Sequence, residues 1–422
     1  MTILAIDDTD SRTLGMCTTY VGHLIAERLK SNGHNVERVM LIRLNPAAKH
    51  KTRGNAAVSI HTDAPAQECL DVASDFVKRL SADADDMTNP GVVVSPTDEV
   101  SDEVSNFTQK TLTSLRSIDE AEEIIKRNGY LSYYLGNGRG RIGCIAAIGA
   151  WKSLDDWTYE CIAYRDEEVR GTERQVDIDS VFEECETYYP EAWDTVDRKV
   201  GSAVCIPNTP GPILYGIRGD YEELVEELAE EINNIENIES YQTFVTNQGT
   251  DAHIVPVDSI DSMTDNTAYH VEGEVSVEPH TEEGGHVFFE ISDESGSVEV
   301  AAFEPTKHFR NKVRDLRVGD EITVNGEYDD GTVKLEKFKI HSLNRTKTVN
   351  PTCENCGNSM ESAGANQGYR CRNCKTSRDS KEEVEVEREL SEGWHEVPPC
   401  ARRHIAKPLI RGGFDGVEHP FK

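Results

Sequence analysis

Basic residues are scarce in this chain of 422 residues. It holds 44 Lys and Arg against 77 Asp and Glu, which gives a formal net charge of −33 at pH 7. The acid is spread along the chain in runs such as 81–86, 98–103, 222–231 and 382–389. A surface of carboxylates binds water and hydrated cations, and molar salt, with a Debye length of about 3 Å, screens their repulsion. We therefore expect a protein adapted to high salt, from a halophilic organism.

Long apolar runs are missing as well. No stretch approaches the roughly 20 apolar residues that a membrane span needs, and the first residues lack the basic region of a secretion signal. Of the 11 cysteines, four lie in two Cys-x-x-Cys pairs and the others stand singly, which is not the pattern of a disulfide framework. We expect a soluble, cytoplasmic protein with no membrane partner.

The paired cysteines form the most specific motif of the chain. Cys353 and Cys356 are separated from Cys371 and Cys374 by fourteen residues. Two such knuckles can surround one tetrahedral Zn²⁺, and four sulfur ligands leave no open position for catalysis. The motif predicts a structural zinc site, with iron in a rubredoxin-like site as the minor alternative.

The remaining pattern indicates several modules, because 422 residues exceed what one ordinary core organises. Strands alternate with amphipathic helices at the start of the chain, and a second α+β stretch suits a ferredoxin-like unit. Farther along, a helix stands between the third and fourth of five expected strands, which is the order of an OB-fold β-barrel. The predicted fold class is multidomain α+β. The expected domains are 1–128 (α/β), 129–258 (ferredoxin-like), 267–345 (OB-fold), 350–380 (zinc ribbon) and 381–422 (a charged C-terminal extension).

Three aspartates follow the first expected strand. Asp7, Asp8 and Asp10 come directly after the apolar residues 3–6. Carboxylates in that position often hold Mg²⁺ near phosphates, although loop acid is common in so acidic a chain. Phosphatases of the haloacid dehalogenase class carry Asp-x-Asp-x-Thr at this place, and Asp8-Thr-Asp-Ser-Arg12 lacks the final threonine.

Glycine and arginine recur together in three loops of the N-terminal half: 51–55, 136–143 and 216–220. Glycines let backbone N–H groups approach phosphates, and arginine adds bidentate contacts. None of the loops has the Gly-Lys-Ser/Thr of a Walker A motif. The three together predict a polyphosphate site, and a simple turn is the alternative for each one alone.

Seven short motifs together resemble one family. They are Ile6-Asp-Asp-Thr-Asp-Ser11, Gly15-Met-Cys-Thr-Thr-Tyr20, Arg43-Leu-Asn45, Lys51-Thr-Arg-Gly-Asn55, Gly136-Asn-Gly-Arg-Gly140, Tyr215-Gly-Ile-Arg-Gly219 and Asn247-Gln-Gly-Thr-Asp251. Over nearly its whole length the chain resembles the archaeal tRNA(Ile) 2-agmatinylcytidine synthetases, with a kinase-like domain followed by ferredoxin-like, OB-fold and zinc-ribbon domains.

The resemblance implies an ATP-dependent ligase that attaches agmatine to the wobble cytidine of tRNA(Ile), a minor isoleucine tRNA. ATP would first phosphorylate the carbonyl oxygen of the cytosine, and the agmatine amine would then displace the phosphate. The product reads AUA instead of AUG. Such chemistry calls for Mg²⁺ and arginines around the phosphates, because phosphoryl transfer depends on positioning and charge stabilisation.

The resemblance also implies residue roles. Asp7, Asp8, Asp10 and Thr18 would be catalytic, with Thr18 matching a threonine that the family autophosphorylates. The implied ATP ligands are Lys51, Arg53, Gly54, Asn55, Gly138, Arg139, Gly140, Arg218, Gly219 and Asp220. Asp251 would contact agmatine, and Arg402, Arg403 and Lys407 would contact RNA phosphates.

Two other classes of function stay open at this point. One is a single-strand nucleic-acid-binding protein of the replication protein A type, which also combines OB-folds with zinc ribbons. The other is a metal-dependent phosphohydrolase or nuclease. The first would need neither the aspartates nor the glycine-arginine loops.

Overall fold

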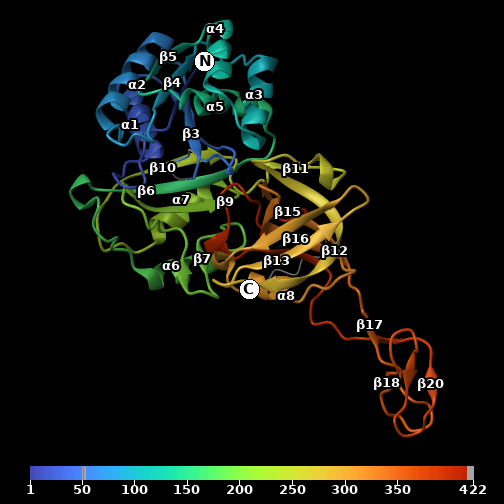
Figure 1. The fold of residues 1–422 in the computed structure, drawn as a ribbon. Helices are drawn as coiled ribbons and strands as arrows, with labels where there is room; N and C mark the ends of the chain where they lie inside the picture. Colours follow the sequence, from blue (N-terminus) through green and yellow to red (C-terminus); the bar gives the residue numbers. More distant parts are fainter. Residues whose placement is uncertain (50, 52–53, 416–422) are drawn as a thin grey trace.

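The structure is a computed structural model that describes residues 1–49, 51 and 54–415. Figure 1 shows an N-terminal α/β unit, a second α+β unit beneath it, a β-barrel beside the second unit, and a small ribbon that extends away from the body. Within the described residues, no helix combines the length and the apolar character that crossing a membrane requires.

The first two units share one continuous sheet. Its strand order is β5-β4-β1-β3-β2-β10-β6-β9. Strand β10 runs parallel to β2, with Val245 opposite Met40 and Thr246 opposite Leu41, and the other neighbours are antiparallel. The strands are β1 (Thr2–Asp7), β2 (Val36–Arg43), β3 (Ala56–Thr62), β4 (Gly91–Ser95), β5 (Leu131–Tyr134), β6 (Thr158–Arg165), β9 (Ile213–Gly219) and β10 (Ile238–Thr246). Because the sheet is unbroken, side chains from both units can face one cavity.

Helices cover both faces of the N-terminal half of this sheet. Helices α1 (Thr18–Ser31) and α2 (Ala66–Leu80) pack on one face, and α3 (Asp102–Thr113), α4 (Ile118–Asn128) and α5 (Arg141–Ser153) on the other. The bounds of α4 follow from its sequence. Ser117 and Glu120 form a capping box at its start, and Gly129 ends it in the left-handed conformation.

Helix α5 is the central helix of the first unit. Its small apolar residues 144–148 are fully buried against β1, β3, β4 and α3. The sequence showed this stretch only as a small apolar run, because a helix buried on all sides has no polar face to reveal its period. Helix α5, which follows the boundary expected at residue 128, thus packs in the core of the first unit.

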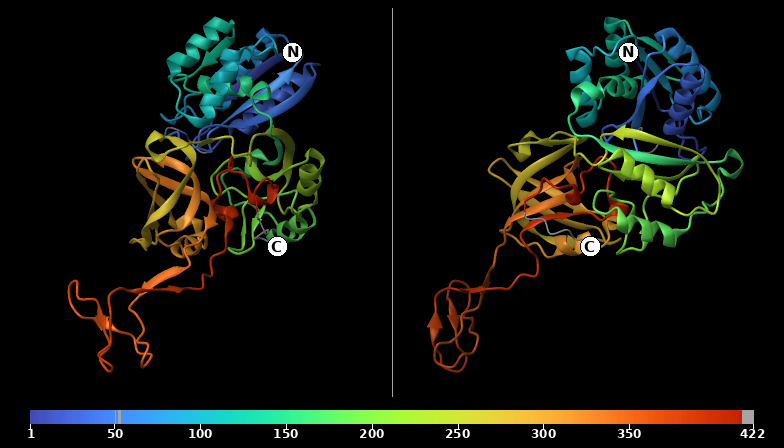
Figure 2. Two further views of the ribbon diagram at one scale, coloured as in Figure 1. Left: turned by 90° about the vertical axis from the view of Figure 1, so that its right-hand side faces the viewer. Right: turned by 180° about the vertical axis from the view of Figure 1, so that it is seen from behind.

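The second unit contributes three strands to the shared sheet, in the order β6-α6-β9-α7-β10 along the chain. The ferredoxin-like order β-α-β-β-α-β has one more sheet strand between the first helix and the strand that corresponds to β9. Figure 2 shows the unit from two further sides. Its helices are α6 (Ile178–Thr187) and α7 (Glu222–Glu231). Helix α7 buries Val225, Leu228 and Ala229 and turns its acidic residues to solvent. Two short strands, β7 (Val196–Asp197) and β8 (Ser202–Ala203), pair beside it.

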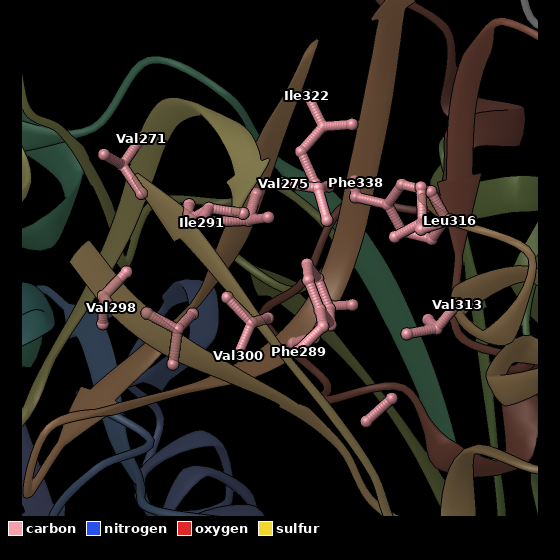
Figure 3. Close-up of a cluster of buried hydrophobic side chains, with 14 of the residues drawn as sticks. Val271, Val275, Phe289, Ile291, Val298, Val300, Val313, Leu316, Ile322 and Phe338 are labelled. Atoms are coloured by element: carbon pink, nitrogen blue, oxygen red, sulfur yellow. The ribbon is translucent and has the colours of Figure 1, made fainter. Parts of the chain in front are cut away.

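The third unit is the barrel. Antiparallel pairing of β12 with β15 and parallel pairing of β14 with β16 close it. Figure 3 shows its core, in which Val271, Phe289, Val300 and Phe338 meet. The helix expected between the third and fourth strands is a short 3-10 turn, η3 (Glu304–Thr306), followed by α8 (Phe309–Arg314). The strands are β12 (Thr267–Thr281), β13 (Val287–Ser292), β14 (Ser297–Ala302), β15 (Glu321–Asp329) and β16 (Thr332–Ser342). Strand β11 (Ile254–Pro256) is added beside β12, and the 3-10 turn η2 (Ile260–Ser262) lies between β11 and β12.

The ribbon hangs on a two-stranded stalk of β17 (Thr346–Val349) and β21 (Glu382–Glu385). Three short strands surround its cysteines, and Figures 1 and 2 show it clear of the body. They are β18 (Glu361–Ser362), β19 (Tyr369–Arg370) and β20 (Ser377–Arg378).

Residues 393–411 of the expected C-terminal extension are folded into the body. Strand β22 (Gly393–Glu396) joins β16 of the barrel, and the turns η4 (Pro399–Ala401) and η5 (Leu409–Arg411) follow it between the barrel and the second unit. Ile405, Ala406 and Leu409 are buried there. The charged composition of residues 381–422 concealed these few apolar anchors.

Candidate active site

A cavity of about 860 Å³ opens where the first unit, the second unit and the C-terminal tail meet. This is within the size range of pockets for a nucleotide-sized ligand. Eleven of the residues expected from the sequence line it: Asp7, Asp8, Asp10, Thr18, Lys51, Gly54, Asn55, Arg139, Gly140, Arg218 and Arg402. Arg53 lies outside the described residues.

The aspartates occupy the end of β1. The backbone N–H of Asp8 donates to Asp7 Oδ1 at 2.7 Å, and Asp8 Oδ2 accepts from the N–H of Asn89 at 3.1 Å and from Arg139 Nη2 at 2.8 Å. Burial raises the pKa of Asp7 well above its usual range, and the negative charge of Asp8 adds to the effect. Burial also raises the pKa of Asp8 to about 6, although Arg139 opposes the shift. Both carboxylates would gain from a nearby cation.

The donor chemistry at this site fits Mg²⁺, which prefers carboxylate oxygens and phosphate. The oxygen atoms of the three aspartates do not form a compact set of metal ligands. Within the part of the chain that the structure describes, one group of at least three possible metal ligands has all its donor atoms within 4.8 Å of one another, and that group is the four cysteines. The aspartates therefore suit an ion that a nucleotide brings with it, not a preformed metal cage.

The glycine-rich loop before α5 lets that helix approach β1 directly. A Cβ on Gly140 would lie 2.6 Å from the carbonyl oxygen of Asp7, and one on Gly143 would lie 2.1 Å from Asp7 Oδ2. Gly138 lies outside the cavity, and its positive φ of 69° turns the chain beside the Tyr134 ring. These glycines allow Arg139 to reach the aspartates. From the sequence, the glycines were explained only by the approach of phosphates.

Thr18 is the first residue of α1 and lines the cavity. Its Oγ1 lies 3.0 Å from Thr9 Oγ1 and 3.4 Å from the N–H of Thr9. The hydroxyl is thereby fixed against the loop that carries Asp8 and Asp10. A helix start is also a favourable place for a phosphate.

The opposite wall contains residues that sequence reasoning did not assign. Glu160 on β6 lies 3.7 Å from Arg43 Nη2 and 3.4 Å from Arg218 Nε, and it accepts from Gln248 Nε2 at 2.6 Å. All four side chains are largely buried. Two guanidinium groups face the Glu160 carboxylate, and Arg218 Nη1 also lies 4.0 Å from Asp194 Oδ2. The sequence feature that could have indicated this wall is Arg43, a charged residue that follows the apolar residues 39–42 at the end of β2.

The tail supplies the remaining wall, including Pro399, Cys400, Arg402 and His404. Arg402 was expected to contact RNA, but its side chain is 3% exposed and pairs with Asp194 and, at 2.7 Å, with Glu396. Such burial favours a structural role. From the sequence, this charged extension was assigned to RNA contacts, so its part in the cavity was missed.

The other expected RNA contacts are also engaged within the protein. Arg403 pairs with Glu327 at 2.5 Å and with Glu336 at 3.4 Å, and Lys407 Nζ lies 3.8 Å from Asp156. Each cation therefore has an acidic partner in the fold, which leaves less charge for phosphates.

Three further expected residues lie outside the cavity wall. Asp251 binds Lys337 Nζ at 2.6 Å and accepts from the N–H of Lys407 at 2.7 Å, so it joins the second unit to the barrel and the tail. Asp220 Oδ1 accepts from Arg411 Nε at 2.6 Å. Gly219 has no room for a side chain, because its Cβ would lie 2.8 Å from Val225. These positions hold the fold together around the site.

The four expected zinc ligands do come together. The Sγ atoms of Cys353, Cys356, Cys371 and Cys374 all lie within 4.8 Å of one another. The first cysteine of each pair is buried and the second is exposed. This arrangement fits one tetrahedral metal ion with four thiolate ligands.

Curated relatives cover the whole chain. A protein of Haloquadratum walsbyi, named as the tRNA(Ile) 2-agmatinylcytidine synthetase TiaS, is 47% identical over 100% of both chains. The namesake of Methanosarcina mazei is 42% identical over 97% of each. The chain belongs to this synthetase family. The source of the first relative agrees with the predicted adaptation to salt.

Sequence models of the family match this member in the expected order. They are the TiaS TCKD domain (residues 3–65), the TiaS FLD domain (138–253), an OB-fold nucleic acid binding domain (269–334) and the TiaS C-terminal zinc ribbon domain (350–390). The predictions of an OB-fold and a zinc ribbon are thereby confirmed.

Solved structures of the family superimpose closely on this member. The crystal structure of TiaS in complex with its isoleucine tRNA and ATP gives a TM-score of 0.91 at 42% identity, covering 100% of this chain and 99% of that one. The complex of TiaS with the same tRNA, AMPCPP and agmatine gives 0.87 at 40%, with the same coverage. The predicted multidomain fold class is confirmed.

Proposed function

We propose that this protein uses ATP to attach agmatine to the wobble cytidine of tRNA(Ile), the minor isoleucine tRNA, forming 2-agmatinylcytidine. The observation that carries the proposal is the single cavity in which the aspartates of β1 face Arg43, Arg139 and Arg218. Solved relatives bind ATP, agmatine and this tRNA, as their names state. A tRNA substrate also favours a cytoplasmic location.

The first step is phosphorylation of the cytosine O2 by ATP. Asp7, Asp8 and Asp10 would hold the Mg²⁺ of the nucleotide, which supplies charge stabilisation when bound. Arg43 and Arg218 neutralise phosphate oxygens from the opposite wall, and Thr18 offers a hydroxyl beside the aspartates. Other proposed ATP contacts are Lys51, Arg53, Gly54, Asn55, Arg139 and Gly140, of which Arg53 is known only from the sequence.

The second step is displacement of that phosphate by the amine of agmatine. Phosphorylation converts a poor electrophile into a carbon with a good leaving group. The product reads AUA in place of AUG. The cavity is enclosed by three parts of the chain, so the wobble base has to leave its stack to reach the aspartates. The zinc of the ribbon is structural in this proposal, because four thiolates fill its coordination sphere.

The test uses the full chain in molar salt with tRNA(Ile), ATP and agmatine. Mass spectrometry of the wobble nucleoside should show the agmatine adduct, and ATP should be consumed as the adduct forms. The variant Arg218→Ala should form it far more slowly, whereas Arg345→Ala, which removes an exposed pair with Glu392, should match the wild type.

Other outcomes identify the alternatives. ATP consumption with unchanged tRNA would indicate a phosphohydrolase. Tight tRNA binding with intact ATP would indicate a nucleic-acid-binding protein without ligase activity. Either result overturns the proposal.

A further inference from the structure

His404 is a histidine of the tail that faces the cavity and, among the described residues, enters no ion pair. It follows η4 and lines both the main cavity and a smaller one of about 340 Å³ beside it. Two backbone hydrogen bonds hold this segment to the loop after β10. The carbonyl oxygen of His404 accepts from the N–H of Gly249 at 2.9 Å, and the carbonyl oxygen of Ile405 accepts from the N–H of Thr250 at 3.1 Å. His404 is an exposed residue that lines both cavities.

The surroundings of His404 are cationic. A Cβ on Gly54 would lie 3.6 Å from His404 Cδ2 and 2.5 Å from Arg43 Nη1, so this glycine leaves space for both side chains. Arg43 and Arg218 line the same cavity as His404, and Glu160 pairs with both of them. The smaller cavity brings Lys51, Arg403 and Glu327 to its other side.

These neighbours favour the neutral form of the imidazole. Desolvation by the surrounding protein lowers the pKa of His404 well below its usual range, and the charges of Arg43 and Arg218 lower it further. In the described part of the chain, no hydrogen bond engages either ring nitrogen. A nitrogen lone pair is therefore available in the cavity at neutral pH.

The proposed reaction needs such a group. The primary amine of agmatine, like that of lysine, has a pKa near about 10 and is an ammonium ion at neutral pH. An ammonium ion has no lone pair for attack on carbon. The arginines of the wall cannot accept its proton, the aspartates are proposed to face Mg²⁺ and phosphate, and Glu160 is engaged by two arginines and Gln248. His404 has none of these commitments.

We propose that His404 is the general base that takes a proton from the attacking amine of agmatine. The nitrogen lone pair then forms the bond to C2 of the cytosine, the C2–O bond breaks, and its electron pair leaves with the phosphate. The proton resides on the imidazole until it passes to phosphate or water. Phosphate on Arg43 and Arg218 offsets the charges that oppose protonation, so the base becomes effective once nucleotide is bound. The inference rests on the proposed function.

The test separates the two chemical steps in single turnovers with the full chain, tRNA(Ile) and ATP. We expect His404→Ala and His404→Gln to phosphorylate tRNA within a few-fold of the wild-type rate. Addition of agmatine at pH 7 should be about 10²- to 10⁴-fold slower in both variants, the usual contribution of a general base. Gln fills a similar volume and forms hydrogen bonds but takes no proton, so it excludes a purely structural role.

The pH dependence gives a second readout. In the variants only spontaneously deprotonated amine reacts, so the agmatine step should rise about tenfold per pH unit towards the pKa of the amine. The wild-type rate should rise less steeply. His34→Ala, which removes a surface imidazole beside Asp63 and Glu68, should leave both steps unchanged.

Three outcomes would overturn the inference. They are near-normal agmatine addition by His404→Gln, equal loss of phosphorylation and addition, or the same pH slope in variant and wild type. A wild type that phosphorylates nothing and attaches nothing contradicts the proposed function itself, which distinguishes the two failures.

Discussion

Arg139 Nη2 lies 2.8 Å from Asp8 Oδ2 across 131 residues of chain. The same nitrogen donates to the carbonyl oxygen of Met87 at 2.7 Å. The guanidinium thereby joins the loop after β1 to the start of α5. Asp8 nevertheless keeps a pKa raised to about 6, because burial outweighs the pairing.

This raised pKa predicts that the ionised Asp8 carboxylate lowers the free energy of unfolding, although the proposed reaction needs it. A carboxyl with a pKa of 3.8 when unfolded and about 6 when folded destabilises the fold once both states are ionised, above about pH 6. The difference disappears below about pH 4. In metal-free buffer at pH 7 to 8, Asp8→Asn should raise the free energy of unfolding by about 1–3 kcal/mol while tRNA modification is lost. Thermal unfolding against pH at constant salt measures this.

The two proteins should have converging melting temperatures as the pH falls towards 4. A variant that melts lower than the wild type at pH 7 would mean that the Arg139 pairing outweighs the cost of burial.

Gly143 should be required for activity more than for folding. Within a helix, Gly→Ala normally stabilises by about 1 kcal/mol. In Gly143→Ala the new Cβ would lie 2.1 Å from Asp7 Oδ2, so the Asp7 carboxylate has to move. We expect a fall of about 100-fold or more in the rate of tRNA phosphorylation, because misplacement by about 1 Å is that costly. Gly296→Ala is the matched control, since nothing lies within 4 Å of its Cβ. Equal rates for the two variants would show that Asp7 is not at the reacting centre.

Arg402 should stabilise the assembly of the units and not the RNA complex. Its replacement by Met leaves the buried Glu396 carboxylate without its cation and leaves Asp194 with only Arg218, at 4.0 Å, which costs about 3–5 kcal/mol. We expect a large fall in melting temperature. Arg345→Met, at an exposed pair, should change stability by less than about 1 kcal/mol. If the tRNA affinity of the folded Arg402 variant drops while its melting temperature does not, Arg402 is an RNA contact after all.

Zinc removal should unfold the ribbon alone. The ribbon's own core contains only Cys353, Met360 and Cys371, with Tyr369 against them, too little to fold without a metal. Cys353→Ser should therefore lose bound zinc and become open to proteases between β17 and β21. The melting of the body should stay as in the wild type, because the stalk separates the two (Figure 1). Cys69→Ala, at a buried cysteine of α2, should keep its zinc.

A ribbon that stays protease-resistant without zinc would contradict this prediction. Metal analysis and limited proteolysis of the two variants decide it.

Local patterns in the sequence were enough to predict many of the helices and strands, the zinc ligands and the barrel. The strands and amphipathic helices expected to alternate at the start of the chain are present as β1, α1, β2, β3 and α2. Spacing alone identified the four zinc ligands, and the order of strands around a short helix identified the barrel. Residue periodicity, turn chemistry and ligand spacing are properties of neighbouring residues, so a single sequence displays them.

Only the tertiary structure decided the rest. The pairing of β10 with β2 joins two units into one sheet, and the tail returns to place His404 beside Arg43. Arg402 looked like a free cation in the sequence, but its partner Asp194 lies 208 residues away. No local pattern encodes which distant strand or carboxylate a residue meets, because that choice depends on the packing of the whole chain.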